Sequence, residues 1–269
     1  MQLPISGLNI RFHAPHGSDD LAILEASGTA VERALTVLPR LVEVVELADR
    51  TTAGNTSEFW ATFTVTDFET ALLGLRRFLF GDKVTCLFRD NSHACGERME
   101  LAFSITSFLE DARPRTHRGV ERVPETPGWF RLTASAATAL RFRLPLVEDQ
   151  LAVLDQPHAM TLLARRCIDF TRLSVRTITR VEQVMEAMAP PVSRPLTGKC
   201  PGCGEPVIVS LHVARLIMDE LQSSATGVHE QIHTIAAAYH WGEADILALP
   251  QRRRRAYAEI IQQRQRAAI

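Results

Sequence analysis

The stretch VHEQIHTIAAAYHWGEADILALPQRRRRAYAEII, from Val228 to Ile261, is the most informative part of the 269-residue sequence. Apolar side chains recur there at the spacing of one helical face, namely at Val228, Ile232, Ile235 and Tyr239. Gly242 is a suitable N-cap for a second, short helix, which we expect to run to about Leu249. Pro250 suits the start of a third helix, because its missing amide proton is not needed there. The stretch therefore predicts a compact three-helix unit.

Two kinds of side chain in this unit are candidates for contact with a partner. Trp241 precedes the second helix, where it can either pack on Ile246 as a hydrophobic staple or remain on the surface. A run of four arginines begins the third helix and reads as a solvated face or a dock for an acidic partner. Aromatic residues and arginine dominate the energetics of protein interfaces. We therefore assign partner binding to Trp241, Arg252, Arg253, Arg254 and Tyr257.

Cys200-Pro-Gly-Cys203-Gly has the form of a zinc knuckle, a tight turn that offers two thiolates to the metal. Structural zinc is almost always four-coordinate, so the chain must supply two further ligands. Cys86 and Cys95 are the candidates, and the segment between them contains His93. We expect one structural zinc held by these four cysteines. A redox role is less favoured, because a strand-like alternation follows Cys203, whereas redox CxxC motifs open a helix.

Two halves of the sequence resemble each other. Leu140 to Asp155 aligns without a gap with Ile10 to Glu25, and each segment reads as a short strand, a proline turn and a helix. Cys-Gly-Glu followed by alternating apolar residues occurs at both Cys95 and Cys203. Residues 111–128 are proline-rich and charged, which is typical of a linker. Two unrelated domains with ordinary strand-turn-helix starts remain the alternative.

The preferred interpretation is an α+β fold made of two divergent tandem copies of a small strand-helix unit with a zinc-knuckle-like turn. The first copy, at residues 1–110, has a degenerate knuckle. The second copy, at residues 129–269, has the CPGCG knuckle and ends in the three-helix tail, which the first copy lacks.

An enzymatic alternative comes from His229-Glu230-Gln-Ile-His233, which is a literal HExxH sequence. In zinc peptidases this spacing places two imidazole ligands and a general base on one helical face. A third ligand is required, and Ala236 and Tyr239 stand where the extended motif has glycine and histidine. A zinc metallopeptidase that uses His229, Glu230 and His233 is therefore the alternative, and the main prediction is a protein that is not an enzyme.

Composition narrows the classes of partner. A formal charge of -1 and a pI near 6.8 give no overall attraction to nucleic acid or to an anionic membrane. No apolar run reaches the roughly 18 residues of a membrane helix, and the N-terminus lacks the layout of a signal peptide. There is also no glycine-rich phosphate loop or nucleophile elbow. We expect a cytoplasmic protein with no nucleic acid, membrane or small-molecule substrate.

A series of motifs carries a family resemblance. In chain order it comprises Arg141–Pro145 with Asp149-Gln150, Cys200–Gly204, Glu230 with His233, Tyr239 with Trp241, Glu243 with Asp245, Ile246–Pro250, and Arg253-Arg254 with Tyr257. The series resembles the baseplate hub assembly chaperone family of T-even-type phages, whose relatives are also encoded with phage-like contractile injection systems. It covers roughly the second half of the chain.

This resemblance implies a non-enzymatic structural component or assembly chaperone of a baseplate hub, stabilised by zinc. The implied partners are hub or spike proteins, which the protein would meet in the cytoplasm during assembly. Whether it stays in the assembled tail particle is left open by the resemblance.

Overall fold

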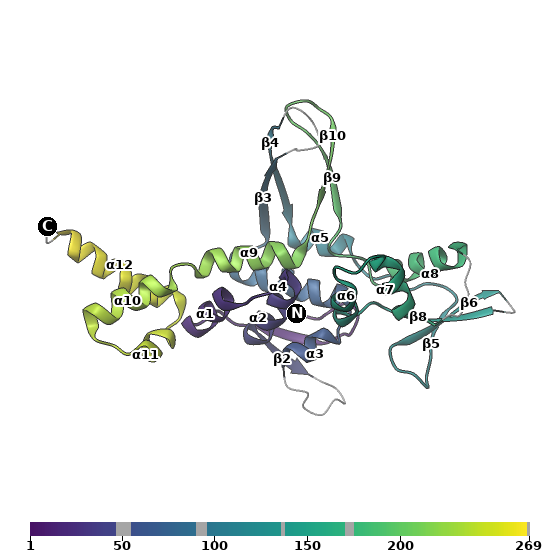
Figure 1. Ribbon diagram of the computed structural model, residues 1–269, viewed down its shortest axis with the longest axis horizontal. Helices are drawn as coiled ribbons and strands as arrows, with labels where there is room; N and C mark the ends of the chain where they lie inside the picture. The colour runs from purple at the N-terminus through teal and green to yellow at the C-terminus, as the bar shows by residue number, and fades with distance from the viewer. Residues whose placement is uncertain (47–54, 90–95, 136–137, 170–174, 268–269) are drawn as a thin grey trace.

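The computed structural model describes residues 1–46, 55–89, 96–135, 138–169 and 175–267. The fold is α+β, as the sequence predicted, with small antiparallel sheets among many helices. A central body carries a helical tail on one side, a smaller subdomain on the other, and two β-hairpins that project from it (Figure 1). None of the helices in these residues is long and apolar enough to cross a bilayer.

The body is organised around α4 (Val65–Phe80). Thr64 caps this helix by accepting a hydrogen bond from the amide of Asp67, and Gly81, at φ 89°, ends it. Every side chain of α4 from Thr66 to Arg76 is buried. The elements around it are β1 (Asn9–Phe12), α1 (Gly17–Glu25), α2 (Ala30–Leu41), β2 (Val42–Glu46), α3 (Ser57–Ala61), α5 (Ile105–Asp111) and α9 (Val213–Ala225).

Helix α9 shows that the hydrophobic core does not follow the predicted division of the chain. Although α9 belongs to the second half, its buried residues Ile217, Met218 and Leu221 lie in the same cluster as Leu38 and Leu72 of the first half. The helix packs against α1, α2 and α4. The two halves therefore share one main core.

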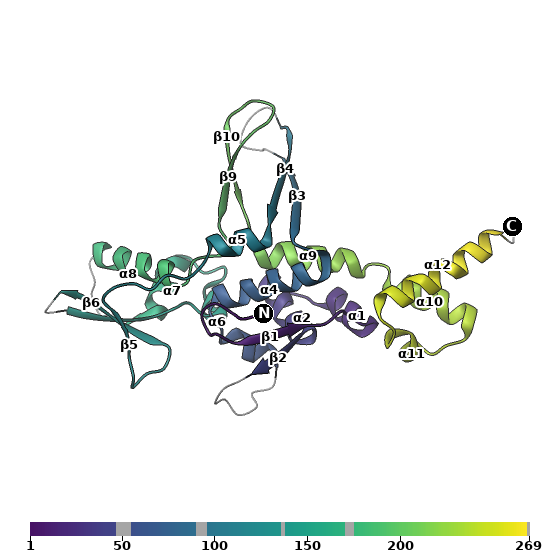
Figure 2. The same ribbon diagram turned by 180° about the vertical axis from the view of Figure 1, so that it is seen from behind.

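The two hairpins stand side by side in both views (Figures 1 and 2). They are formed by β3 (Lys83–Arg89) with β4 (Arg98–Ser104), and by β9 (Pro195–Lys199) with β10 (Pro206–Ser210). Met99 of the first hairpin packs on Cys200 and Val207 of the second, in a cluster separate from the main core. The hairpins therefore support each other away from the body.

The smaller subdomain contains a four-stranded antiparallel sheet in the order β5-β6-β7-β8, with a core that includes Leu132, Phe142 and Val184. Its elements are β5 (Val120–Arg122), β6 (Trp129–Ser135), β7 (Thr138–Arg143), α6 (Val147–Val153), α7 (Ala159–Cys167), β8 (Ile168–Asp169) and α8 (Val175–Met188). The predicted linker at residues 111–128 is therefore partly wrong, because it contains the edge strand β5. Three residues between prolines and charges are too few to show strand periodicity.

The two halves have a similar succession of elements. Each begins with a strand, two helices and a strand and ends with a hairpin and a helix, first from β1 to α5 and again from β7 to α9. Between the second strand and the hairpin lie two helices, α3 and α4, in the first half and one, α8, in the second. β1 pairs with β2 and β7 pairs with β8, in both cases antiparallel. Asp19 and Asp149 occupy the third position of α1 and α6 and accept hydrogen bonds from the N-cap amides of His16 and Leu146.

The tail consists of α10 (Val228–Tyr239), α11 (Glu243–Leu247) and α12 (Gln251–Ala267). Gly242 caps α11 and Pro250 precedes α12, as predicted, although the short helix ends two residues before Leu249. The helices enclose a small core of Ile235, Ile246 and Ile261.

Part of the tail has a counterpart in the first half. α3 and α11 have 5 residues each, α4 and α12 have 16 and 17, and three residues separate the helices in each pair. The last linking residue forms an isolated β-bridge in both cases, Thr64 with Leu146 and Pro250 with His16. Since Leu146 and His16 are the N-caps of α6 and α1, the two helix pairs dock on equivalent places. Each helix pair thus places its last linking residue at the N-cap of a helix in the other half of the chain.

Candidate partner-binding surface and metal site

A buried ion pair attaches the tail to α1. The guanidinium of Arg254, which is 0% exposed, donates to the carboxylate of Asp20, which is 2% exposed. It also donates to the carbonyl oxygen of Leu249 at 2.6 Å. Burial raises the pKa of Asp20, and the attraction of Arg254 offsets this only in part. Arg254 is therefore buried inside the protein and does not lie on the predicted partner surface.

The helical period explains why one arginine of the run differs from its neighbours. Arg254, Ala258 and Ile261 are buried at i, i+4 and i+7 and form the inner face of α12. Arg252 and Arg253 lie off this face and are exposed. The sequence pattern showed a basic run, but the acidic partner that draws one member inward lies in α1.

Three aromatic rings form a cluster where α10, α11 and α12 meet. The centroid of Trp241 is 5.3 Å from that of Tyr239 and 5.4 Å from that of Tyr257. Trp241 is 39% exposed, and Nη2 of Arg253 lies 3.4 Å from the hydroxyl of Tyr257. The structure thus brings together three predicted contact residues, Trp241, Arg253 and Tyr257. The two options for Trp241 were packing on Ile246 and remaining on the surface. In the structure its ring packs on the two tyrosines and stays partly exposed to solvent.

The HExxH residues lie on the solvent side of α10. His229, Glu230 and His233 are all exposed, and Glu230 accepts a hydrogen bond from Gln262 at 3.3 Å. Across the part of the chain that the structure describes, no group of three or more His, Cys, Asp or Glu side chains is arranged to hold a metal ion. A third ligand for a peptidase zinc is therefore absent from these residues.

The CPGCG sequence forms the turn between β9 and β10. The amide of Gly204 donates to the carbonyl oxygen of Cys200 at 2.8 Å. The amide of Cys200 donates to the carbonyl oxygen of Glu205 at 2.9 Å. Gly204 has φ 76°, a conformation that favours glycine. Cys200 is buried and Cys203 is exposed. The turn touches the other hairpin, because a Cβ on Gly202 would lie 3.3 Å from the side chain of Glu97.

Of the other predicted ligands, Cys86 is not brought to this turn. Cys86 lies in the middle of β3, opposite Leu101, and packs on the main core. Burial and the nearby Glu220 raise the pKa of its thiol, whereas Arg76 lowers it. Cys95 and His93 lie outside the described residues. The structure therefore places Cys200 and Cys203 in one turn and Cys86 nearer the base of the hairpins.

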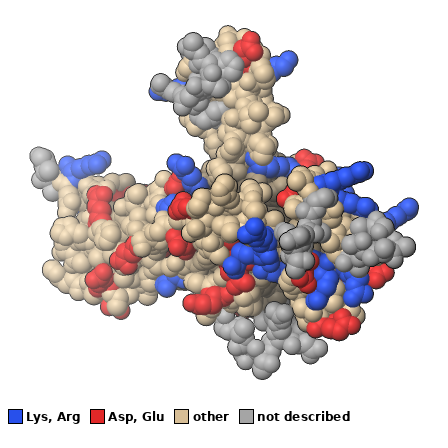
Figure 3. All heavy atoms as spheres, turned by 45° about the vertical axis from the view of Figure 1, so that its right-hand side comes forward, with Lys and Arg blue, Asp and Glu red and all other residues tan. Residues whose placement is uncertain are grey.

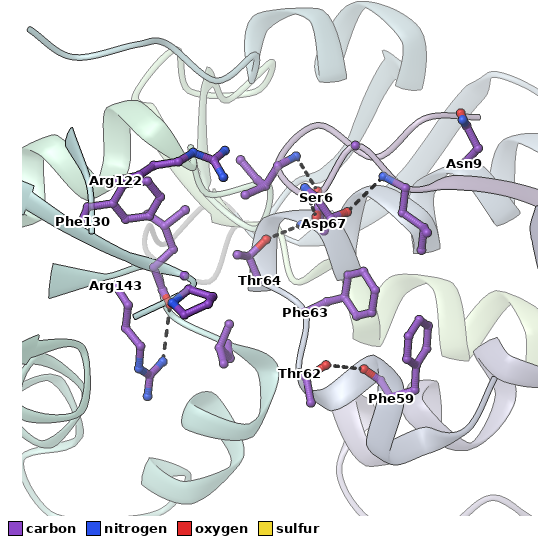
Figure 4. A pocket seen from close by; sticks show the side chains of 17 residues that line it. Ser6, Asn9, Phe59, Thr62, Phe63, Thr64, Asp67, Arg122, Phe130 and Arg143 are labelled. Carbon is purple, nitrogen blue, oxygen red and sulfur yellow. Dashed lines mark hydrogen bonds between the residues drawn. The ribbon is translucent and has the colours of Figure 1, made fainter. Parts of the chain in front are cut away.

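A cavity of about 640 Å³ separates the N-terminal segment from the smaller subdomain (Figure 4). Asp67, at its wall, is fully buried and accepts hydrogen bonds from the amides of Ile5 and Ser6, both at 2.8 Å. Arg143, at the opposite wall, is paired with Asp149. Three aromatic side chains also line the cavity, Phe59, Phe63 and Phe130. Asp67 and Arg143 are already engaged by protein groups, and the other charged side chain of the lining is Arg122. The lining therefore offers no evident catalytic set.

Sequence reasoning missed two features that the structure makes plain. Asp20 anchors the tail, and its only signal was its place beside Asp19 in the first turn of a helix. The second feature is a concentration of arginine between residues 111 and 180, which the near-neutral total charge conceals. Charge counted by segment would have found it.

Comparison with known proteins does not place the chain in a family. No family model matches the sequence, and no curated protein or solved structure matches the chain. The resemblance to baseplate hub assembly chaperones therefore rests on the order of the motifs alone.

Proposed function

We propose that this protein is a non-enzymatic structural component or assembly chaperone of the baseplate hub in a phage-like contractile tail or injection system. The observation that supports this most is the cluster of Trp241, Tyr257 and Arg253, exposed on a tail that Arg254 fixes to the body. Exposed aromatic rings beside arginine are typical of interface hot spots.

In this proposal the tail is a preformed binding surface. Arg253 and Tyr257 lie on α12, and Trp241 lies in the link between α10 and α11. Since these helices share a core, little conformational entropy is lost when a hub or spike protein binds. Arg252 and Arg253 add charge at the rim, where they guide an acidic partner more than they add affinity. The protein would hold its partner in the cytoplasm during assembly of the particle.

Zinc at the hairpin tips is a second part of the proposal. The turn between Cys200 and Cys203 fits half of a tetrahedral thiolate site. The remaining ligands would come from the facing hairpin, where Cys95 is the predicted ligand. The position of Cys86 near the base of the hairpins argues against Cys86 as a ligand. Bound zinc would give the two tips one fixed shape.

We further propose that the chain arose by duplication. The matching order of elements, the equivalent capping aspartates and the two docked helix pairs support this origin. In each case the link between a five-residue helix and a longer helix contacts the N-cap of the first helix of a unit.

Co-expression with the hub and spike proteins encoded beside this gene tests the function. The wild-type chain should co-purify with one of them, and Trp241→Ala should reduce the recovered partner. Phe78→Ala, which truncates a side chain 51% exposed on the body, is the matched control and should not reduce it. Equal recovery from both variants would contradict the proposed surface.

Zinc content per chain tests the metal site and the enzymatic alternative together. We expect Cys203→Ser to lose the metal, and Cys86→Ser and the double change His229→Ala with His233→Ala to retain it. Loss of zinc only in the histidine variant, with peptide cleavage abolished by Glu230→Gln, would replace this proposal with a metallopeptidase.

A further inference from the structure

Arginine is concentrated in the smaller subdomain and its approach. Residues 111–180 contain twelve arginines and seven acidic residues, whereas 18 of the 30 Lys and Arg and 24 of the 31 Asp and Glu lie elsewhere. Figure 3 shows basic side chains spread over this side of the molecule. A neutral chain thus has a basic region, and charge complementarity makes acidic partners the natural class to consider.

Two of these arginines face each other in the middle of the sheet. The register places Glu121, Arg131, Arg141 and Asp169 side by side on β5, β6, β7 and β8. The next row along the sheet, which contains Phe130 and Phe142, faces the core. The charged row therefore lies on the outward face, with its two positive charges at the centre and a carboxylate at each end.

Arg141 is held in a fixed position. Its guanidinium lies 5.6 Å from the ring centroid of Trp129 and donates to the hydroxyl of Thr126 at 2.9 Å. It approaches the carboxylate of Asp169 only to 3.8 Å. These contacts orient its planar group without neutralising it through a direct hydrogen bond to an acid.

The side chain of Arg131, directly opposite, is exposed and makes no hydrogen bond or ion pair with any described residue. Like charges directly opposite on neighbouring strands destabilise a sheet. The row therefore carries a local electrostatic cost that an anion between Arg131 and Arg141 would remove.

We propose that Arg131 and Arg141 bind a side-chain carboxylate from an acidic segment of a partner protein. Two adjacent guanidinium groups match the two oxygens of a carboxylate. Glu121 and Asp169 would repel a phosphate backbone that crosses the row, whereas a single carboxylate meets only its positive centre. Trp129 offers an apolar contact beside it. This surface is separate from the tail cluster and does not depend on the function proposed above.

Fluorescence anisotropy of the full chain with a labelled peptide that carries one glutamate among neutral residues tests the inference, with the glutamine version of the peptide as a reference. At an ionic strength of about 0.15 M, Arg131→Gln should weaken binding of the glutamate peptide by about tenfold, as expected for a lost charge-assisted hydrogen bond. Arg264→Gln removes the same charge from an exposed site on the tail and should change binding by less than about twofold.

Thermal unfolding separates this role from a structural one. Arg131→Gln removes both the like-charge neighbour of Arg141 and the opposite-charge neighbour of Glu121. Because these two effects have opposite signs and similar sizes, the melting temperature should change little while peptide binding falls. Three results would overturn the inference: equal loss in the two variants, no preference for glutamate over glutamine, or tighter, Arg131-dependent binding of a single-stranded oligonucleotide.

Discussion

At the scale of single residues, Arg254 has the largest effect on the position of the tail. It stands in a run of four arginines, yet it alone is buried, because Asp20 of α1 lies opposite the inner face of α12. Removing one member of such a pair leaves the other charged group buried without a counter-ion.

We therefore expect Arg254→Met to lower the free energy of unfolding by about 3 kcal/mol or more. Arg253→Met is the matched control and should change it by less than about 0.5 kcal/mol, because Arg253 is exposed. The double variant Asp20→Asn with Arg254→Met should be more stable than Arg254→Met alone, since no buried charge remains. Urea unfolding of these proteins and of Asp20→Asn alone measures this, and strictly additive effects of the two single changes would contradict the pairing.

Asp149 gives a prediction about pH. Burial disfavours its charge, but hydrogen bonds from Arg143, the amide of Leu146 and Arg166 outweigh this and lower its pKa from 3.8 to about 2. A carboxyl whose folded pKa is lowered contributes stability above its unfolded pKa and loses it as pH falls through the folded value.

Relative to Asp149→Asn, the wild type should therefore be more stable by about 2 kcal/mol at neutral pH. This advantage should fall by about half near pH 3 and disappear below pH 2. Urea unfolding of both proteins between neutral pH and about pH 3 measures it. A difference that stays constant over that range would show that Asp149 does not titrate as described.

The residue scale also shows the limit of sequence reasoning. The closeness of Trp241 and Tyr257 was predictable, because a short helix and a local turn at Gly242 and Pro250 separate them. The burial of Arg254 was not, because its partner Asp20 is more than two hundred positions away and no local period identifies it. The same applies to the pairing of Arg131 with Arg141, which depends on strand register.

At the scale of elements, helix ends were predicted better than their associations. Gly242 and Pro250 mark the starts of α11 and α12 by local backbone geometry. The docking of α9 on α1, α2 and α4 joins the two halves of the chain, and apolar side chains on a helix face do not specify which neighbour covers them. The strand β5 was missed because it is short and lies among prolines.

The docking of α11 on α1 leads to a prediction at Gly17. A Cβ at Gly17 would lie 2.7 Å from Cα of Leu247, a backbone atom that cannot move without shifting the helix. Val147 occupies the equivalent first position of α6, where the docked pair is α3 and α4. The absence of a side chain at position 17 therefore lets the tail approach closely.

Gly17→Ala should lower the free energy of unfolding by about 1 to 3 kcal/mol, although alanine normally favours a helix. Gly198→Ala is the control, because a Cβ there has open space around it. Urea unfolding compares the two, and a Gly17→Ala protein as stable as the wild type would show that the tail does not press on α1.

At the scale of the whole molecule, the hairpin tips, the tail and the body have separate hydrophobic clusters. Met99, Cys200 and Val207 form a cluster too small to hold two hairpins together tightly by apolar burial alone. If zinc joins the tips, its removal should loosen them without unfolding the main core around α4.

Amide hydrogen exchange before and after treatment with a chelator measures this effect. Exchange should accelerate in β9, β10 and the turn from Cys200 to Gly204, and stay unchanged in α4 and α9, because local openings follow local contacts. Cys203→Ser should show the fast exchange without chelator and no further change with it. If chelation accelerated exchange equally in α4, the metal would support the main core and not the hairpin tips. If it changed nothing in either place, the CPGCG turn would hold its shape through its backbone hydrogen bonds alone.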